Sequence, residues 1–488
     1  MTALPSSPDA ALADVAIIGG GFSGTLLAIQ MMRAAGAIPC RIVLLERRER
    51  VGPGLAYATT FIDHLLNVPA ARMSAFPDAP ADFLDWLHRT VGPVDGRAFV
   101  PRRLYGQYLA DTLATVRAAH PAAELVQCRA DVVGCDFDLK GSAWVVRVRD
   151  GDDIPTRRVV LAVGNARPAN PLNDPVAMRA ARFVPDPWNA DALAACAGRE
   201  PLLLLGSGLT ALDVVLMLRS LGQTGPVFAL SRRGLTPHAH HASRSAPPDL
   251  RLPERLAVQL ATAEVNADGV RCAGSRLSLS ALLRELRRIA RECRDWRILV
   301  DQLRPLTNPL WRRLDASQRR SFLRHARSYW DVHRHRAAPV IAAQVAALRR
   351  SGGLVILSGR IGTVRADADG LVAEIRPRGG GAATGLRVAR VINCTGPDPN
   401  PARSADPLLL GLLRDGHARA DALGLGLVTT PSGAMVAADG TVSDSLFALG
   451  AMRRPLDWES TAVPELRVQA AALARALMAA PETAIRTA

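Results

Sequence analysis

Glycines at a fixed spacing follow two short apolar runs, and this pattern is typical of a dinucleotide site. Gly19, Gly21 and Gly24 come directly after the apolar residues 15–18 and before a helix-forming stretch, residues 25–35. The first glycine permits a tight turn, the second lets backbone approach a pyrophosphate, and the third lets helix pack closely on strand. The N-terminus of the helix offers N–H donors to the phosphates. The expected contacts are Gly19, Gly21, Phe22, Ser23 and Gly24.

A second glycine fingerprint differs from the first in the charge at the end of its second strand. Glu46 ends the next apolar run, residues 41–46, where a carboxylate accepts hydrogen bonds from ribose hydroxyls. The second fingerprint has arginines at the corresponding point, and guanidinium groups bind a 2′-phosphate. A solvated loop in an arginine-rich protein is the alternative. The expected NADP contacts are Gly206, Ser207, Gly208, Thr210, Ser231, Arg232 and Arg233. A separate NADPH site then implies that the first nucleotide is FAD.

Strand and helix patterns surround both fingerprints. Strand-helix-strand order in about thirty residues is a βαβ unit, which builds parallel sheets. A helical, tryptophan-containing stretch at 278–347 follows the second unit, and short strands return after it. The fold class expected is α/β, with two Rossmann-like dinucleotide-binding domains and a helical insertion. We expect an FAD domain at 1–197 and 351–488, an NADP domain at 198–350, and the insertion at about 250–338.

Four longer motifs resemble one family of flavoproteins. They are residues 52–57 (GPGLAY), 64–76 (HLLNVPAARMSAF), 330–336 (WDVHRHR) and 461–467 (TAVPELR). With both fingerprints, they resemble the bacterial YdhS-type FAD/NAD(P)-binding proteins, which are similar to class B flavin monooxygenases. Some relatives are implicated in hydroxylating the amine of amino acids such as aspartate. The resemblance covers nearly the whole chain. It departs from the wider flavoprotein pattern at Ala451, where many relatives carry an aspartate.

The resemblance and the strand pattern suggest further flavin contacts. Three apolar strands end in small residues at Gly164, Gly396 and Gly450. The segment 64–76 lies where flavoproteins fold a loop beside the isoalloxazine. There Asn67 is expected to contact the flavin, and His64 and Arg72 the substrate, with turn chemistry and a solvated arginine as the alternatives. The remaining candidates for FAD are Arg102, Gln107 and Thr461, the last at a helix N-terminus that stabilises negative charge on reduced flavin.

Cysteine and histidine spacing limits the chemistry. None of the seven cysteines pairs as CxxC, so a zinc knuckle, a disulfide framework and a dithiol redox centre are not expected. Histidines cluster at 238–241 and 333–335 with cationic neighbours and no acids beside them, so no metal site is expected. If the clusters approach each other, they form a cationic pocket for a carboxylate or for NADPH phosphates. A surface cap is the alternative.

Charge and hydropathy exclude several partners. The 60 Lys and Arg residues outnumber 45 Asp and Glu, but Lys140 is the only lysine and the arginines are dispersed, so no nucleic-acid partner is expected. The chain begins without a signal-like segment, and no apolar run reaches the roughly 18 residues of a membrane span. A cytoplasmic location without membrane contact is expected; the oligomeric state is left open.

Together these features predict an FAD-dependent, NADPH-using monooxygenase. It would hydroxylate a small anionic or zwitterionic substrate with O2 through a flavin C4a-hydroperoxide, as the resemblance implies. Two alternatives stay open at this point. One is an NADPH-dependent flavin reductase or oxidase, and the other is a non-catalytic flavin-binding redox sensor.

Overall fold

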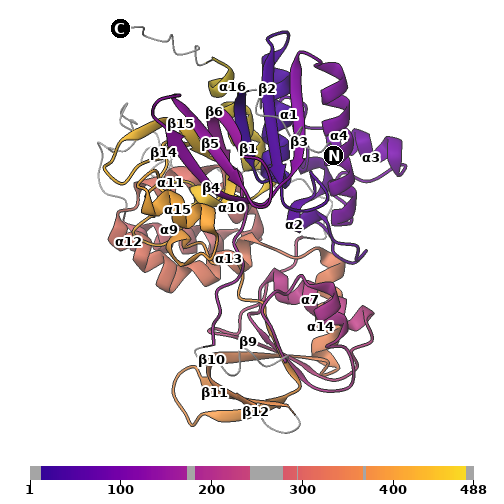
Figure 1. Cartoon of the computed structure of the whole chain (residues 1–488). Coiled ribbons are helices and arrows are strands. Elements are labelled where there is room, and N and C mark those ends of the chain that lie inside the picture. The colour runs from indigo at the N-terminus through magenta and orange to yellow at the C-terminus, as the bar shows by residue number, and fades with distance from the viewer. Residues whose placement is uncertain (1–11, 173–181, 242–277, 294, 367–369, 480–488) are drawn as a thin grey trace.

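The computed structural model describes residues 12–172, 182–241, 278–293, 295–366 and 370–479 (Figure 1). Within them, the strands form two sheets, one of eight and one of seven strands. The expected fold class is confirmed: each sheet has a parallel core that contains one of the two glycine turns.

The first sheet is built around the first glycine turn. β1 and β2 pair in parallel, and their neighbours extend the order to β14-β15-β6-β1-β2-β3, with β4 and β5 as an antiparallel branch beside β6. Its central strands β1 and β2 are mostly apolar and buried, as is usual for parallel strands that are covered on both faces. Its strands are β1 (Ala13–Ile18), β2 (Cys40–Glu46), β3 (Ala123–Arg129), β4 (Val132–Asp138), β5 (Ala143–Val148), β6 (Ile154–Leu161), β14 (Ala434–Val436) and β15 (Val442–Ala448).

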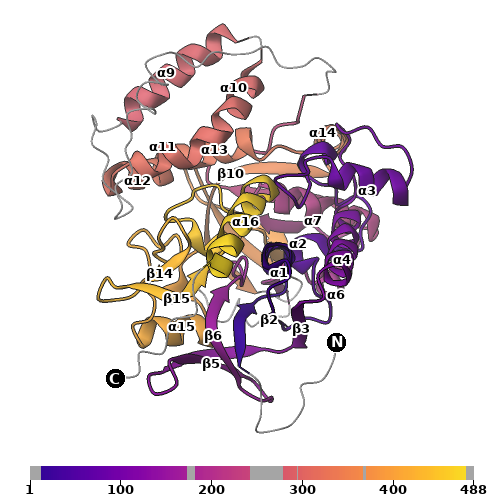
Figure 2. The ribbon, with the colours of Figure 1, turned by 90° about the horizontal axis from the view of Figure 1, so that it is seen from above.

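Helices from both ends of the chain cover this sheet. α1 (Phe22–Ala35) packs against α4 (Arg102–Ala119) and against the C-terminal helix α16 (Val463–Ala479), which lies beside it in Figure 2. Their apolar side chains form one buried core with β1 and β2. Smaller helices complete the unit: α2 (Gly54–Tyr57), η1 (Ala70–Arg72), α3 (Asp82–Thr90), η4 (Pro401–Arg403), α15 (Pro407–Arg414) and η5 (Gly450–Arg453).

The second sheet has the order β12-β11-β10-β9-β8-β13-β7 and contains the second glycine turn. Its strands are β7 (Phe183–Val184), β8 (Leu202–Leu205), β9 (Val227–Ser231), β10 (Leu354–Ala366), β11 (Leu371–Pro377), β12 (Thr384–Val388) and β13 (Arg390–Asn393). Its helices are α6 (Ala190–Ala194), α7 (Leu209–Ser220) and α14 (Pro339–Arg350). The β11–β12 hairpin has its turn at the glycine triplet 379–381.

This strand order corrects our expectation that the chain returns to the first sheet at residue 351. β10 continues the parallel sheet beside β9, with Ser358 paired to Ser231, and β13 pairs with β8. Even β7, which we had placed in the FAD domain, pairs with β13. An apolar strand carries no local mark of the sheet that it joins, since the pairing depends on the neighbour. We therefore propose that the second unit spans about 182–395.

Two connections join the units side by side. Pro168 and Pro397 form an antiparallel bridge, and the amide of Asn393 donates to the carbonyl of Ala169 at 3.0 Å. In Figure 1, these connections run as coil between the upper and lower units. The bridge holds the sites of the two units in a fixed relation.

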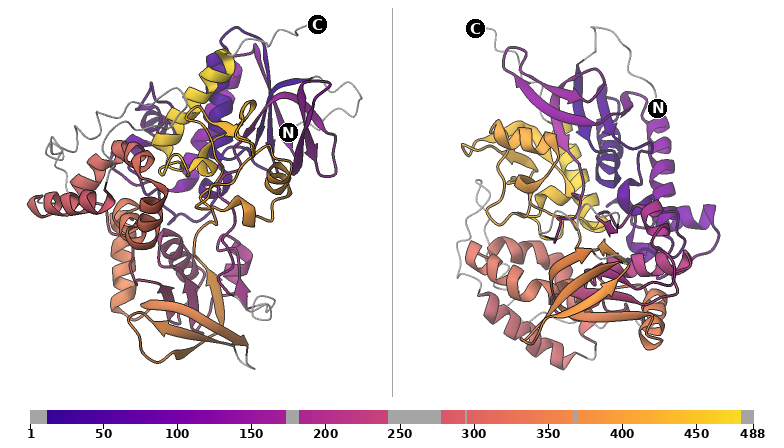
Figure 3. Two further views of the ribbon diagram at one scale, coloured as in Figure 1. Left: turned by 90° about the vertical axis from the view of Figure 1, so that its left-hand side faces the viewer. Right: turned by 60° about the horizontal axis from the view of Figure 1, so that its bottom comes forward.

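The predicted insertion is helical, and it leaves the second unit to contact the first (Figure 3). Trp311 and Leu310 pack with Trp458, and the Trp311 indole donates to the carbonyl of Pro455 at 3.0 Å. Its elements are α9 (Leu279–Glu292), α10 (Trp296–Leu303), η2 (Arg304–Leu306), α11 (Thr307–Arg313), α12 (Ala316–Ser321), the π-helical turn η3 (Phe322–Ala326) and α13 (Arg327–Arg334). The part of the expected insertion at 250–277 lies outside the described residues.

Candidate functional site

The first glycine turn has the crowded backbone that a dinucleotide site needs. Gly19 has a φ of +104°, and a Cβ there would lie 2.5 Å from the Ala162 carbonyl oxygen. A Cβ on Gly24 would lie 1.9 Å from the Gly19 oxygen. Only glycine fits at both positions, so the turn keeps α1 tightly against β1.

The N-terminus of α1 is open to an anion. Gly21 is its N-cap and provides no side-chain cap, so the first N–H groups have no side-chain acceptor. Phe22 packs on Tyr57 and Tyr105, and the Ser23 hydroxyl lies 3.0 Å from where a Cβ on Gly450 would stand. This cradle of uncapped N–H groups fits the pyrophosphate of FAD.

Glu46 lies where a ribose would be held. Its carboxylate is buried at the end of β2, and Oε1 accepts the N–H of Arg48 at 2.9 Å. Gly164 follows β6 in the same sheet, with a φ of +72°. Ser460, at the entry to α16 beside Thr461, is fully buried, and its hydroxyl has no partner among the described residues. An orphaned hydroxyl here is the kind of group that a bound cofactor would satisfy.

The second glycine turn repeats this arrangement. Gly206 has a φ of +117°, and a Cβ there would lie 2.3 Å from the Cys394 oxygen. Gly208 is the N-cap of α7, again without a side-chain cap, and a Cβ there would meet open space. Thr210 lies in the first turn of α7. The helix start therefore fits a second pyrophosphate.

The pairing of β13 with β8 places Gly396 beside this second turn rather than the first. Cys394 and Gly396 stand to Gly206 as Ala162 and Gly164 stand to Gly19, because each pair follows the strand that lies next to its glycine turn. The assignment of Gly396 to FAD stays a prediction that this placement does not favour.

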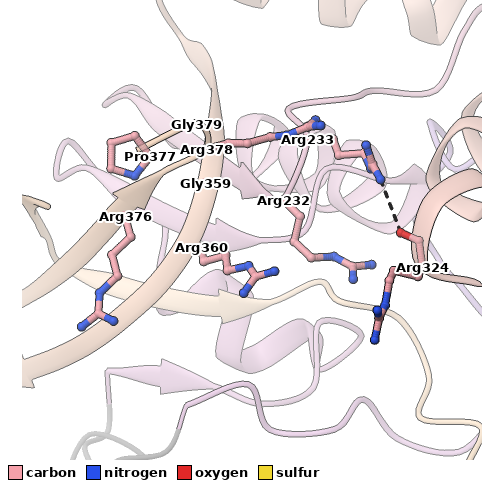
Figure 4. Close-up of a pocket in the computed structure, with 9 residues that line it drawn as sticks. All are labelled: Arg232, Arg233, Arg324, Gly359, Arg360, Arg376, Pro377, Arg378 and Gly379. Carbon is pink, nitrogen blue, oxygen red and sulfur yellow. Dashed lines mark hydrogen bonds between the residues drawn. The ribbon is translucent and has the colours of Figure 1, made fainter. Parts of the chain in front are cut away.

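Two pairs of residues lie at or near the end of β9, one of serines and one of arginines. The hydroxyls of Ser207 and Ser231 bond each other at 2.7 Å, which ties the turn to the strand. Arg232 and Arg233 line a pocket of about 360 Å³ together with four more arginines (Figure 4). Arg232 and Arg233 thus belong to a larger group of arginines than the sequence indicated, and their contact with NADP stays a prediction.

The two units meet at residues that we had expected to contact cofactor or substrate. The Arg102 guanidinium forms an ion pair with Asp213 of α7 at 2.8 Å, and it also donates to the Leu65 carbonyl. His64 is buried, with its ring nitrogens 2.7 Å from the Thr59 hydroxyl and 3.3 Å from the Asp213 carbonyl oxygen. These contacts give Arg102 and His64 a role in positioning α7. Their direct roles stay predictions that the contacts do not favour.

The other residues that we expected to contact flavin or substrate differ in environment. Asn67 lies at the seam between the units, because its carbonyl accepts the His240 Nε2–H at 2.9 Å. Arg72 is exposed. Gln107, also exposed, lines a groove of about 1310 Å³ between α4, β3 and residues 49–60. No contact shown by the structure tests the flavin role of Asn67 or Gln107.

The two histidine clusters lie next to each other. A bridge between Ala239 and Ala337 joins their backbones, and the rings of His238 and His333 lie 4.6 Å apart with Trp296 against both. Among the described residues, no group of three His, Cys, Asp or Glu side chains is arranged to hold a metal ion.

A comparison with known protein families supports a dinucleotide site at the first glycine turn. Residues 16–166 match the sequence profile of a family described as FAD-NAD(P)-binding. They hold the first glycine turn, Glu46 and the strand before Gly164. The first unit contains an FAD-NAD(P)-binding domain. No curated protein matches the chain in sequence.

Solved structures show how far this fold extends. Ornithine hydroxylase of Pseudomonas aeruginosa superposes over 96% of this chain and 99% of its own, with a TM-score of 0.64 and 15% identity. Ornithine N-hydroxylase of Kutzneria sp., solved with reduced FAD, NADP+ and L-ornithine, covers the same shares at a TM-score of 0.63 and 14% identity. L-lysine 6-monooxygenase of Pseudomonas syringae covers 95% and 99%, at 0.63 and 19%. These neighbours show that the chain shares their fold through both units and the insertion.

No helix in the described part of the chain is long and apolar enough to cross a bilayer.

The seam between the FAD-NAD(P)-binding domain and the second unit should be sensitive to acid. Burial, with a smaller contribution from the nearby Arg336, lowers the pKa of His240 to about 4. Burial also lowers the pKa of His64. Since the unfolded chain takes up these protons near pH 6.5 and the folded chain excludes them, stability falls as the pH drops from about 6.5 towards 4.

We expect H240Q to weaken this dependence, because glutamine keeps an N–H donor for the Asn67 carbonyl but does not titrate. Thermal melting at several pH values between 7 and 4.5 measures it. A variant that loses as much stability as the wild type over this range would contradict the assignment to His240.

Proposed function

We propose that the protein is an FAD-dependent, NADPH-using monooxygenase that hydroxylates a small polar substrate. The amine of an amino acid is the first candidate, with aspartate as one example. The observation that carries the proposal is the pair of uncapped glycine turns, Gly19–Gly24 and Gly206–Gly208, in two sheets joined by the Pro168–Pro397 bridge. When bound, FAD would accept hydride from NADPH and activate O2.

The first unit binds the resident cofactor in this proposal. The N-terminus of α1 binds the pyrophosphate, and Glu46 accepts the ribose hydroxyls through the carboxylate oxygen that Arg48 leaves free. Thr461 and the N-terminus of α16 would stabilise negative charge on the reduced flavin. Asn67, whose carbonyl is bound by His240 at the seam, would contact the isoalloxazine.

The absence of a thiol pair among the described residues favours oxygen as the electron acceptor. The six described cysteines are all free, and burial raises the pKa of the Cys40 thiol to about 11 and that of Cys394 further. Protonated, buried thiols are poor nucleophiles, so these residues do not provide a dithiol route for the electrons.

The insertion covers the edge where the substrate would enter. Asn308 accepts the N–H of Glu459 at 2.8 Å and donates to its carbonyl, while Arg304 pairs with Glu465 at 2.6 Å. Both acids flank Thr461. The insertion therefore seals the region proposed for the flavin, and excluding water there protects a reactive oxygen species from wasteful breakdown.

Buried cations under the insertion support an anionic or zwitterionic substrate. Arg334 and Arg336 are buried and pair with Glu459 and Asp301. The Arg334 Nε lies 3.2 Å from the Glu459 carboxylate, whereas the Arg336 Nε–H has no hydrogen-bond acceptor in the described part of the chain. A donor of this kind fits a carboxylate. The structural neighbours act on ornithine and lysine, which carry an amine and a carboxylate, so this substrate class is consistent with theirs.

The test follows electrons and oxygen separately. Purified protein should carry FAD, lose its yellow colour with NADPH under nitrogen, and regain it in air. With ornithine, lysine, cadaverine or aspartate offered in turn, the correct amine should yield one hydroxylamine and one water for each NADPH and O2 consumed. Labelled O2 should place one labelled atom in the hydroxylamine.

Two other outcomes would replace the proposal. Hydrogen peroxide in proportion to NADPH, with every amine unchanged, would indicate a flavin oxidase or reductase. Bound FAD that NADPH does not reduce would indicate a redox sensor.

A further inference from the structure

The pocket at the end of β9 contains more positive charge than the two arginines after β9 supply by themselves. Six of its nine lining residues are arginines, and none is acidic. They come from the end of β9, from the β10–β11 hairpin and from η3 of the insertion: Arg232, Arg233, Arg360, Arg376, Arg378 and Arg324.

Three of these arginines already have partners. Arg376 forms an ion pair with Glu374 at 2.8 Å, and its side chain points away from the others (Figure 4). Arg233 donates to the carbonyls of Arg324 and His325 and lies 3.2 Å from the Tyr329 hydroxyl. Arg378 shares that hydroxyl, and together with Arg233 it lowers the pKa of Tyr329.

The other three have no acidic partner within the described residues. They are Arg232, Arg324 and Arg360, and all are exposed. Strand register explains why two of them lie close together. Ser231, the last residue of β9, pairs with Ser358 on the neighbouring parallel strand, so Arg232 follows the end of β9 beside the stretch of β10 that carries Arg360. In the view of Figure 4, the Arg232 guanidinium lies between those of Arg360 and Arg324.

Three unneutralised guanidinium groups from three elements repel one another unless an anion lies between them. A phosphate monoester carries nearly two negative charges and several acceptor oxygens, and guanidinium groups bind it by charge-assisted pairs. In a dinucleotide fold the 2′-phosphate of NADPH lies just beyond the second strand, which is β9 here. NADH lacks this group.

We propose that Arg360 of the β10–β11 hairpin and Arg324 of the insertion join Arg232 in binding the 2′-phosphate of NADPH. The inference rests on the proposed NADPH site and assigns residues outside the βαβ unit to its specificity. Arg233, tied to Tyr329 and to η3, holds the insertion against the pocket instead. The choice between NADPH and NADH then depends on an insertion and a hairpin whose arginines follow Arg232 by 92 and 128 residues.

The experiment uses the full protein with FAD and compares 2′,5′-ADP with 5′-AMP by calorimetry. R360A and R324A should each weaken 2′,5′-ADP binding by about 10-fold to 100-fold, the usual range for a lost charge-assisted bond, with little change for 5′-AMP. Each has a matched control: R365A on the same strand β10, and R320A in the same insertion, are exposed and lie outside the pocket. Added salt should weaken 2′,5′-ADP binding in the wild type and less in R360A.

Two results would overturn the proposal. Wild-type affinity for 2′,5′-ADP in R360A and R324A would remove both residues from the site. Equal losses in R365A and R320A would reduce the effect to the general charge of the protein.

Inorganic phosphate separates the two sources of a phosphate group. If it binds as tightly as 2′,5′-ADP in the wild type, the pocket holds free phosphate and the NADPH assignment is wrong. Because these measurements need no turnover, they remain decisive even if the protein fails to hydroxylate any amine. Conversely, a monooxygenase that uses NADH and NADPH equally would retain the proposed reaction and lose this inference.

Discussion

Replacing Gly24 by alanine should give a folded protein that has lost its flavin. Alanine suits a helix better than glycine does, so α1 itself is not weakened. Its Cβ would, however, lie 1.9 Å from the Gly19 oxygen, which must move and take the glycine turn with it. We expect FAD binding to weaken by more than about a hundredfold, since each tenfold loss needs only about 1.4 kcal/mol. Absorbance at 450 nm per protein and circular dichroism measure cofactor and fold.

Two further glycines separate the causes. Gly36 also has a positive φ, +57°, but a Cβ there meets nothing within 4 Å, so G36A tests backbone strain alone and should keep FAD. Gly206 is crowded in the second turn, so G206A should keep FAD and lose reduction by NADPH. A yellow G24A, or a colourless G206A, would show that the first turn does not hold the flavin.

Replacing Asp213 by alanine should loosen the second unit from the first. The Arg102–Asp213 pair is nearly buried, with side chains 15% and 10% exposed, so removing the acid leaves the guanidinium charge without a counter-ion inside the seam. Breaking a buried pair typically costs about 3–5 kcal/mol of stability. Urea unfolding should show this loss, and flavin reduction by NADPH should slow because α7 carries the second glycine turn.

An exposed ion pair serves as the control. Arg33 and Asp78 lie 2.7 Å apart but are 33% and 60% exposed, so D78A should cost no more than about 1 kcal/mol. The double variant R102L/D213L removes both charges and should recover part of the stability. If D213A and D78A prove equally mild, the seam does not depend on the Arg102 pair.

The glycine turns were predictable because their chemistry is local. A strand, three glycines at fixed spacing and a helix lie within thirty residues, and no distant contact is needed to recognise them. The acid at Glu46 and the arginines after β9 belong to the same local units. The helix that begins near Pro464 and the hairpin tip at 379–381 were predictable for the same reason.

The roles of single polar residues were less predictable. His64 and Arg102 lie in segments that resemble flavin-binding loops, yet both contact Asp213, which lies more than a hundred residues away. Arg232 and Arg233 are adjacent in sequence, but only Arg233 is held by the insertion. A side chain's partner depends on which elements pack beside it, and periodicity carries no information about that.

The sequence by itself predicted two dinucleotide units, a coenzyme for each of them, and no CxxC pair. These properties follow from backbone space and charge within single βαβ units. Only the tertiary structure decided that β10 to β13 complete the second sheet, that the insertion seals the segment before α16, and that Arg324 and Arg360 meet Arg232. The physical reason is that strand pairing and ion contacts join residues distant in the chain, and their energies depend on burial and geometry that exist only after folding.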